Sequence, residues 1–143
     1  MKVSIVQMNS GDGIQDNLDA AEQLVADCRR SDQPDLIALP EYFSFISGNP
    51  TEMLEAGKEL ESLDIAKYLS NLAREYDVAV HAGSSLIYDE GKLYNQSFVY
   101  DRKGNLLQTY RKIHLFDIVL PNGKKMFESD FAVPSLAELS KSV

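Results

Sequence analysis

The run Asp35-Leu36-Ile37-Ala38-Leu39 places the strongest constraint on how this chain can fold. It is a short apolar segment between Pro34 and Pro40, and polar residues do not alternate with apolar ones along it. A strand with one face in water shows such alternation, whereas a strand covered on both faces does not. The run therefore predicts a buried strand in a sheet that helices flank.

The surrounding segments predict an alternation of strands and helices. A β-type run covers residues 3–8, and a helical pattern opens at Asn17, continues through Cys28 and ends before Pro34. A second helix is expected over about residues 62–77 with Ser62 as its N-cap, and a short helix over residues 51–54. Strands are expected at residues 78–88, 93–101 and 105–115, the last two forming a hairpin. This order predicts an α/β fold with a mixed sheet covered by helices, without internal repeats or linkers.

The charge balance limits the classes of partner. The 143 residues carry a net charge of −8, from 22 acidic and 14 basic residues. Nucleic-acid and anionic-membrane partners need a basic surface, so neither is expected. The basic runs Arg102-Lys103 and Lys124-Lys125 are interpreted as solvated loop charges. No apolar run approaches the roughly 18 residues of a membrane span, and residues 1–7 lack the apolar core of a secretory signal.

Cys28 is the one cysteine of the sequence, which rules out an internal disulfide and suits a reducing compartment, the cytoplasm. It lies in the middle of the first expected helix, on the apolar stripe. A nucleophilic cysteine needs a partly exposed, polar or electropositive setting, whereas a free cysteine on an apolar stripe packs as a small hydrophobe. We predict that Cys28 is structural.

Glu41 is the first candidate for chemistry. It follows the apolar run after Pro40, so its carboxylate is expected at the C-terminal end of a buried strand. Open α/β sheets place ligand sites at that end, and a carboxylate there could act as a general base. The alternative is an ordinary surface glutamate in a turn, because charged residues are common at such positions.

Lys112 is the second candidate. Strand alternation would place Tyr110, Lys112 and His114 on one face of the last expected strand. An ammonium group beside a developing oxyanion stabilises it, although an isolated strand lysine is more often a salt-bridge partner. Glu128, after a loop built around Pro121-Asn122-Gly123, is unremarkable alone.

The sequence gives no sign of a metal or dinucleotide site. His81 and His114 have no metal-ligand spacing with each other or with Cys28. The segment Gly11-Asp12-Gly13 lacks the third glycine of a dinucleotide fingerprint, because Asp16 stands in its place. We expect neither a metal nor a cofactor.

Several segments together resemble the nitrilase superfamily of carbon–nitrogen hydrolases. They are the opening strand with Asn17 beyond it, Leu39-Pro40-Glu41, Tyr94-Asn95-Gln96-Ser97, the run from Tyr110 to Phe116, and Phe127-Glu128-Ser129. Each is weak alone, but their order and spacing across positions 3 to about 134 form a specific combination. We therefore expect residues 1–134 to be a partial carbon–nitrogen hydrolase domain.

The resemblance implies an α-β-β-α sandwich, of which this chain would form the front half. It implies assembly as a dimer or larger oligomer through the outer helices, and hydrolysis of a small amide without a cofactor. Glu41 would be the general base, Lys112 would stabilise the oxyanion, and Glu128 would position substrate or help the base. A cysteine thiolate would attack the amide carbon. The loop Phe43-Ser44-Phe45-Ile46 is expected to form a partly aromatic pocket wall.

The sequence departs from the family pattern after Pro134. The family nucleophile follows a later strand, beyond the position of Glu128, and these residues contain no such cysteine. Residues 135–143 are expected to be a divergent tail after truncation. We expect the chain alone to be inactive, with strand faces exposed where the family has a second sheet.

Two alternatives remain open. The chain could be half of a split enzyme whose other chain supplies the cysteine, in which case mixing the two would restore activity. It could instead be a non-catalytic interaction protein that docks on full-length relatives through the retained helices. A generic ligand-binding α/β module would leave the joint placement of Glu41, Lys112 and Glu128 unexplained.

Overall fold

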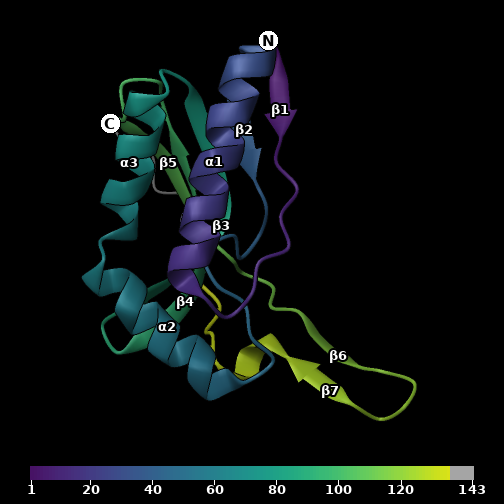
Figure 1. The fold of residues 1–143 in the computed structure, drawn as a ribbon. Coiled ribbons are helices and arrows are strands. Elements are labelled where there is room, and N and C mark those ends of the chain that lie inside the picture. Colours follow the sequence, from purple (N-terminus) through teal and green to yellow (C-terminus); the bar gives the residue numbers. More distant parts are fainter. Residues whose placement is uncertain (136–143) are drawn as a thin grey trace.

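The structure is a computed structural model that describes residues 1–135 (Figure 1). Its elements are β1 (Val3–Ile5), α1 (Ile14–Asp32), β2 (Leu36–Leu39), α2 (Pro50–Ser62), α3 (Ile65–Glu75), β3 (Ala79–Asp89), β4 (Lys92–Tyr100), β5 (Leu106–Arg111), β6 (Asp117–Val119), β7 (Lys125–Phe127) and a 3-10 turn η1 (Glu128–Asp130). The predicted tail over 135–143 lies, apart from Ser135, outside the described residues.

The first five strands form one sheet in chain order, β1-β2-β3-β4-β5. The pairs β1–β2 and β2–β3 are parallel, and the pairs β3–β4 and β4–β5 are antiparallel. This confirms the expected α/β fold with a sheet of mixed direction. The apolar strand β2 lies between β1 and β3, with Ile37 and Leu39 buried and Leu36 and Ala38 only partly buried. Within residues 1–135 the cover that the apolar run predicted on both faces is therefore present on one face only.

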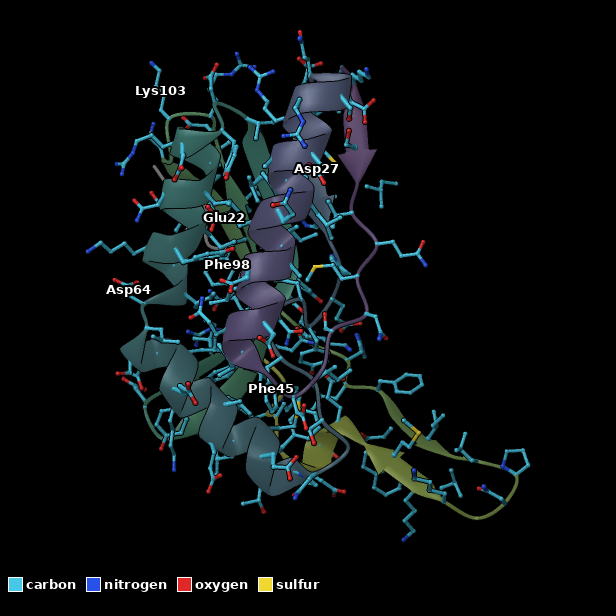
Figure 2. The ribbon with its side chains drawn as sticks, viewed as in Figure 1. Glu22, Asp27, Phe45, Asp64, Phe98 and Lys103 are labelled. Carbon is cyan, nitrogen blue, oxygen red and sulfur yellow. The ribbon has the colours of Figure 1, made fainter. Side chains whose placement is uncertain are left out.

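Helices α1 and α3 lie on the same face of the sheet (Figure 1). The stripe of α1 that faces the sheet includes Leu18, Ala21 and Val25, all buried. Figure 2 shows Phe98 between these helices and the sheet, whereas Asp64 and Lys103 point away from the body. The core is therefore formed between the helices and one face of the sheet. None of the helices within residues 1–135 is long and apolar enough to cross a bilayer.

The helix boundaries correct three expectations. Helix α1 begins at Ile14 rather than at Asn17. Helix α2 begins after Asn49, which caps it by accepting a hydrogen bond from the Thr51 N–H at 3.0 Å, and it extends through Ser62. Ser62 is therefore the last residue of α2 and not the N-cap of the next helix. Asp64, with a φ of 53°, interrupts the helical conformation between α2 and α3. It caps α3 instead, because its side chain accepts a hydrogen bond from the Lys67 N–H at 3.0 Å.

Strand β5 also differs from the sequence-based prediction. It ends at Arg111, so Lys112 and His114 lie beyond the strand, and the expected shared face of Tyr110, Lys112 and His114 is wrong. Strands β6 and β7 form a separate two-stranded sheet that was predicted only as a loop. This hairpin projects from the body of the molecule (Figure 1). Gly123, with a φ of 82°, permits the turn that closes it.

The opposite face of the five-stranded sheet has no helix over it within residues 1–135 (Figure 1). Because Ser4, Ile37 and Val80 are buried toward the helices, their strand neighbours point the other way. The strand register places Ile5, Ala38 and His81 in one row across this face. The Ile5 residue is 81% exposed. We call this surface the open sheet face.

Candidate active site

Glu41 lies in the turn that follows β2, at the C-terminal end of that strand, as the sequence predicted. Its side chain is 54% exposed. Pro40 ends the strand. The turn that follows contacts β3, where the Ser84 carbonyl accepts a hydrogen bond from the Phe43 N–H. The carboxylate therefore stands at the strand end where α/β sheets bind ligands.

A β-bulge in β3 holds this turn in place. The register of β3 against β4 shifts between Ala82 and Ser85, and Ser84 sits in that shift. The Ser84 N–H donates to the Pro40 carbonyl at 3.3 Å, and the Ser84 carbonyl accepts from the Phe43 N–H at 3.2 Å. A Cβ atom on Gly83 would lie 2.4 Å from the Leu39 carbonyl oxygen, so only glycine allows this close approach. Bulges of this kind are used beside active sites to aim a side chain.

Tyr42 adopts a strained backbone conformation directly after Glu41. Its φ is 53°, in the left-handed region that costs a bulky L-residue about 1–2 kcal/mol. The Ser84 hydroxyl oxygen accepts a hydrogen bond from the Tyr42 N–H at 3.1 Å and stabilises this conformation. The Tyr42 ring is buried and packs edge-on against Phe131, with 6.5 Å between ring centroids. Its hydroxyl donates to Glu128.

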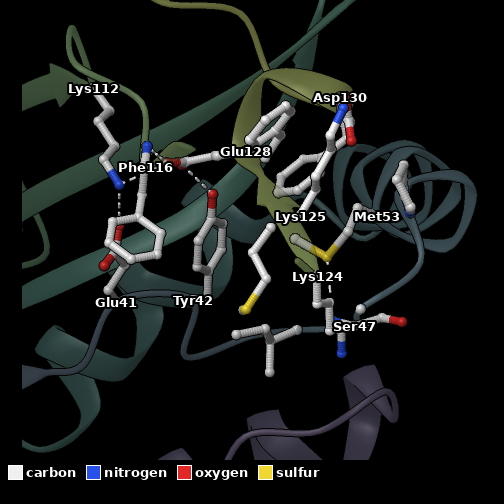
Figure 3. Close-up of a pocket in the computed structure, with 16 residues that line it drawn as sticks. Glu41, Tyr42, Ser47, Met53, Lys112, Phe116, Lys124, Lys125, Glu128 and Asp130 are labelled. Carbon is white, nitrogen blue, oxygen red and sulfur yellow. Dashed lines mark hydrogen bonds and ion pairs between the residues drawn. The ribbon is translucent and has the colours of Figure 1, made fainter. Parts of the chain in front are cut away.

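Lys112 lies where the chain leaves β5. Its N–H donates to the Asn95 carbonyl at 2.8 Å, and its own carbonyl accepts from the Ser135 N–H at 3.0 Å. The Lys112 Nζ atom lies 2.9 Å from Glu41 Oε1 and 2.8 Å from Glu128 Oε2 (Figure 3). The structure therefore brings the three predicted site residues into direct contact.

Glu128 begins the 3-10 turn η1, and its side chain is only 5% exposed. Its Oε1 atom accepts from the Tyr42 hydroxyl and from Asn95 Nδ2 at 2.9 Å. Its Oε2 atom accepts from Lys112 Nζ and from the Phe116 N–H at 2.7 Å. Both oxygens are therefore occupied by donors within the protein, as a buried carboxylate requires.

These contacts fix the charges of the cluster. Burial disfavours the charged form of Glu128, but hydrogen bonds from Lys112, Tyr42 and Asn95 outweigh it and lower the pKa of Glu128. Burial also disfavours a charged Lys112, but its bonds to Glu128 and Glu41 raise the Lys112 pKa. Burial, followed by the bond to Glu128, raises the pKa of Tyr42, so its hydroxyl remains a donor. At neutral pH a protonated Lys112 lies beside the ionised Glu128.

A cavity of about 400 Å³ opens beside this cluster. Glu41, Tyr42, Lys112 and Glu128 line one part of it. Apolar and basic side chains complete the wall, among them Ile46, Met53, Phe116, Met126, Phe127, Phe131, Lys124 and Lys125. A concave apolar site with a few converging polar groups is the usual form of a small-molecule site.

The cavity wall corrects one expectation about the loop after Glu41. Phe43 is fully buried in the core and Phe45 is nearly so, and of that loop's expected wall only Ile46 lines the cavity. Its aromatic wall comes instead from Tyr42, Phe116, Phe127 and Phe131. Lys124 and Lys125 are exposed, as expected of solvated charges, but they also line the cavity.

The family model for carbon-nitrogen hydrolases matches residues 2–139. The chain belongs to the carbon-nitrogen hydrolase family. The resemblance to the nitrilase superfamily that the motifs indicated is thereby confirmed.

Curated family members align with most of the chain. It is 34% identical over 127 residues to a deaminated glutathione amidase of Synechocystis, an alignment that spans 87% of this chain and 46% of that protein. It is 32% identical over 143 residues to omega-amidase NIT3 of Saccharomyces cerevisiae, with 94% of this chain and 48% of that protein aligned. The chain thus spans about half the length of the curated relatives it matches.

Solved structures of the family share the fold. The Caenorhabditis elegans NitFhit protein superposes with a TM-score of 0.81 at 25% identity, over 93% of this chain and 32% of that chain. Yeast Nit3, a member of branch 10 of the nitrilase superfamily, gives a TM-score of 0.74 at 21% identity, over 96% of this chain and 49% of that chain. The α/β front half of the nitrilase sandwich is therefore the fold of residues 1–135.

Sequence reasoning assigned no role to Asn95, although it stood in one of the family-like segments. Its amide Nδ2 donates to Glu41 Oε1 at 2.8 Å and to Glu128 Oε1 at 2.9 Å, so it joins the two carboxylates. An asparagine that falls at a buried position of an inner strand needs hydrogen-bond partners, and that is the signal that could have identified it. For Tyr42 the sequence offers no comparable signal.

The other sequence candidates lie away from this cluster. Cys28 is half-buried in α1, packs against the core and does not line the cavity. His81 belongs to the open sheet face, and His114 is exposed. Within residues 1–135 no group of three or more His, Cys, Asp or Glu side chains could hold a metal ion.

Proposed function

We propose that this site serves amide hydrolysis, with Glu41 as the general base and Lys112 as the cation that stabilises the oxyanion. One observation carries the proposal: a single ammonium group contacts both Glu41 and Glu128 at the wall of a cavity. The names of similar family members, a deaminated glutathione amidase and an omega-amidase, support the same class of reaction.

In this proposal the nucleophile is a cysteine from outside these 143 residues. Its thiol proton passes to Glu41 while sulfur attacks the amide carbon, and Lys112 stabilises the negative carbonyl oxygen. When this intermediate collapses, the carbon–nitrogen bond breaks and the amine leaves with the proton from Glu41. Water, losing a proton to Glu41, then attacks the thioester carbon, and the acid and the free thiol are released.

The two glutamates take different roles in this scheme. Glu41 is more than half exposed, and among residues 1–135 its hydrogen bonds from Asn95 and Lys112 both fall on Oε1. Its Oε2 atom is therefore the carboxylate oxygen that can exchange a proton with a nucleophile. Glu128 has both oxygens occupied, so we assign it to holding Lys112 in place rather than to proton transfer.

The cavity favours a small amide that also carries an acidic group. Besides the cluster around Lys112, its wall carries two basic side chains, Lys124 and Lys125, and one acidic side chain, Asp130. Met53, Phe116 and Met126 offer apolar contact. A carboxylate at the far end of the substrate would be attracted to these lysines. An amide of a small acid fits this arrangement without any cofactor.

Cys28 does not serve as the nucleophile in this proposal, because it packs against the core in α1 and does not line the cavity. Residues 1–143 alone are then inactive, since base and oxyanion cation act only together with a nucleophile. Free thiols of this kind belong to a reducing compartment such as the cytoplasm.

The test is an assay of ammonia release from small ω-amides. The purified chain alone is expected to release none, and mixing it with a polypeptide that carries the cysteine half of a related amidase is expected to restore release. Glu41→Gln should abolish the restored activity, while Cys28→Ser, the matched control, should leave it unchanged. Hydrolysis by the chain alone that Cys28→Ser abolishes would contradict the assignment of the nucleophile.

A second candidate is a non-catalytic interaction protein or homo-oligomer subunit. The open sheet face, with Ile5 and Val3 exposed, favours this role because an uncovered apolar face invites association. Stable co-purification with a full-length relative, without any gain in hydrolysis, would support this candidate over the split enzyme.

A further inference from the structure

We infer that Tyr42 is a positioning residue of this site: its hydroxyl, carried on a left-handed turn that Ser84 holds, fixes the Glu128 carboxylate against Lys112. The inference concerns the geometry of the cluster. It rests on the proposed function only in one respect, the role of Lys112 as the cation that stabilises the oxyanion.

The backbone of Tyr42 explains why two consecutive side chains enter one site. In an extended strand, neighbouring side chains point to opposite faces. The left-handed φ of 53° at Tyr42 breaks that alternation. Glu41 and Tyr42 consequently both reach the cluster around Lys112 and Glu128, from the same turn (Figure 3).

The strain at Tyr42 is matched by specific restraints. In the part of the chain that the structure describes, the other non-glycine residues with positive φ are polar and lie at helix ends or turns: Gln33, Asp64, Asp77 and Glu90. Tyr42 alone among them is aromatic and buried, and its N–H donates to the Ser84 hydroxyl oxygen at 3.1 Å. Strained residues persist where the surroundings over-determine them, and such residues cluster at functional sites.

The hydroxyl contributes more than packing. Phenylalanine would fill the same space against Phe131, so ring packing does not require the oxygen atom. The Tyr42 hydroxyl donates to Glu128 Oε1, the oxygen that Asn95 also contacts. Removing a donor from a buried carboxylate leaves a lone pair without a partner and favours the neutral acid. A neutral Glu128 would hold Lys112 less firmly.

The experiment measures the titration of Glu128 by carbon NMR of its carboxyl group, in the full chain. Tyr42→Phe is expected to move the Glu128 midpoint to higher pH. Tyr68→Phe is the matched control, because it removes a part-buried hydroxyl that donates to the Leu18 carbonyl at 2.9 Å, and Tyr68 does not line the cavity. It should leave the Glu128 midpoint unchanged. An unchanged midpoint in folded Tyr42→Phe would overturn the inference.

A second pair of variants covers the case in which Tyr42→Phe does not fold. Ser84→Ala keeps the Tyr42 hydroxyl but removes the acceptor of its N–H, and should shift the Glu128 midpoint in the same direction. Ser70→Ala removes a hydroxyl that donates to the Gly104 carbonyl at 2.7 Å and should not. Equal Glu128 midpoints in these two variants would refute the positioning role of Tyr42.

The titration measures no turnover. A failed hydrolysis assay therefore leaves this result intact, and the two proposals fail separately.

Discussion

Lys112 and Glu128 form an ion pair of 2.8 Å between side chains that are 23% and 5% exposed. The β6–β7 hairpin brings them together by returning the chain to the end of β5. There the Glu128 N–H donates to the Phe116 carbonyl at 3.1 Å, and the Phe116 N–H donates back to Glu128 Oε2 at 2.7 Å. The hairpin is thus a structural part of the site, although it projects from the body.

Replacing Lys112 should destabilise the fold. Lys112→Met leaves the buried Glu128 without its cation, and breaking a buried pair in this way costs about 3 kcal/mol. Lys2→Met is the matched control, since Lys2 pairs with Asp32 at 3.8 Å on the surface. Its loss should cost less than about 1 kcal/mol. Urea unfolding of both variants measures the difference. Equal losses in the free energy of unfolding would mean that the Lys112 pair stabilises the fold no more than a surface ion pair does.

Stability should fall on the acid side partly through Glu128. Its pKa is lower in the folded protein than its ordinary value of 4.5, so its contribution is fully present above that value. The contribution is lost as the pH falls through the lower folded pKa. Thermal unfolding between neutral and strongly acidic pH should therefore show a shallower acid slope for Glu128→Gln than for the original chain. If stability falls with the same slope in Glu128→Gln and in the original chain, carboxylates other than Glu128 cause the acid unfolding.

Gly83 should tolerate no side chain. An added Cβ would lie 2.4 Å from the Leu39 carbonyl oxygen and 2.7 Å from the Pro40 carbonyl carbon, both backbone atoms that cannot move aside cheaply. Gly83→Ala is expected to cost about 1–3 kcal/mol and to disturb the turn that carries Glu41. Gly11→Ala is the control, because nothing lies within 4 Å of its added Cβ. Unfolding midpoints, with the Glu41 carboxyl signal as a local probe, distinguish the two.

The sequence predicted the sheet well because its signals are local. The apolar run at β2 and the stripe of α1 each act within a few residues. The sequence predicted the boundaries of helices and strands less well where contacts between distant residues determine them. The N-cap moved from Ser62 to Asp64 because α2 continues through Ser62, and β5 ended at Arg111 because the chain departs there toward the β6–β7 hairpin.

The same distinction applies to the site. Glu41 could be located from its position after a buried strand, and Lys112 and Glu128 from their resemblance to family motifs. Their mutual contacts could not be predicted, because they depend on a bulge at Ser84 and on the left-handed turn at Tyr42. Neither leaves a local pattern in the sequence.

The open sheet face should make the isolated chain self-associate. Ile5 is 81% exposed, and with Val3 it places apolar surface at one edge of that face. Ile5→Lys should reduce the association, because burying a lysine against apolar surface is costly. Leu63→Lys, at a site 49% exposed between α2 and α3 and away from that face, should leave association unchanged. Sedimentation velocity over a range of concentrations measures both, and a monomeric original chain would show that this face does not drive contact between copies.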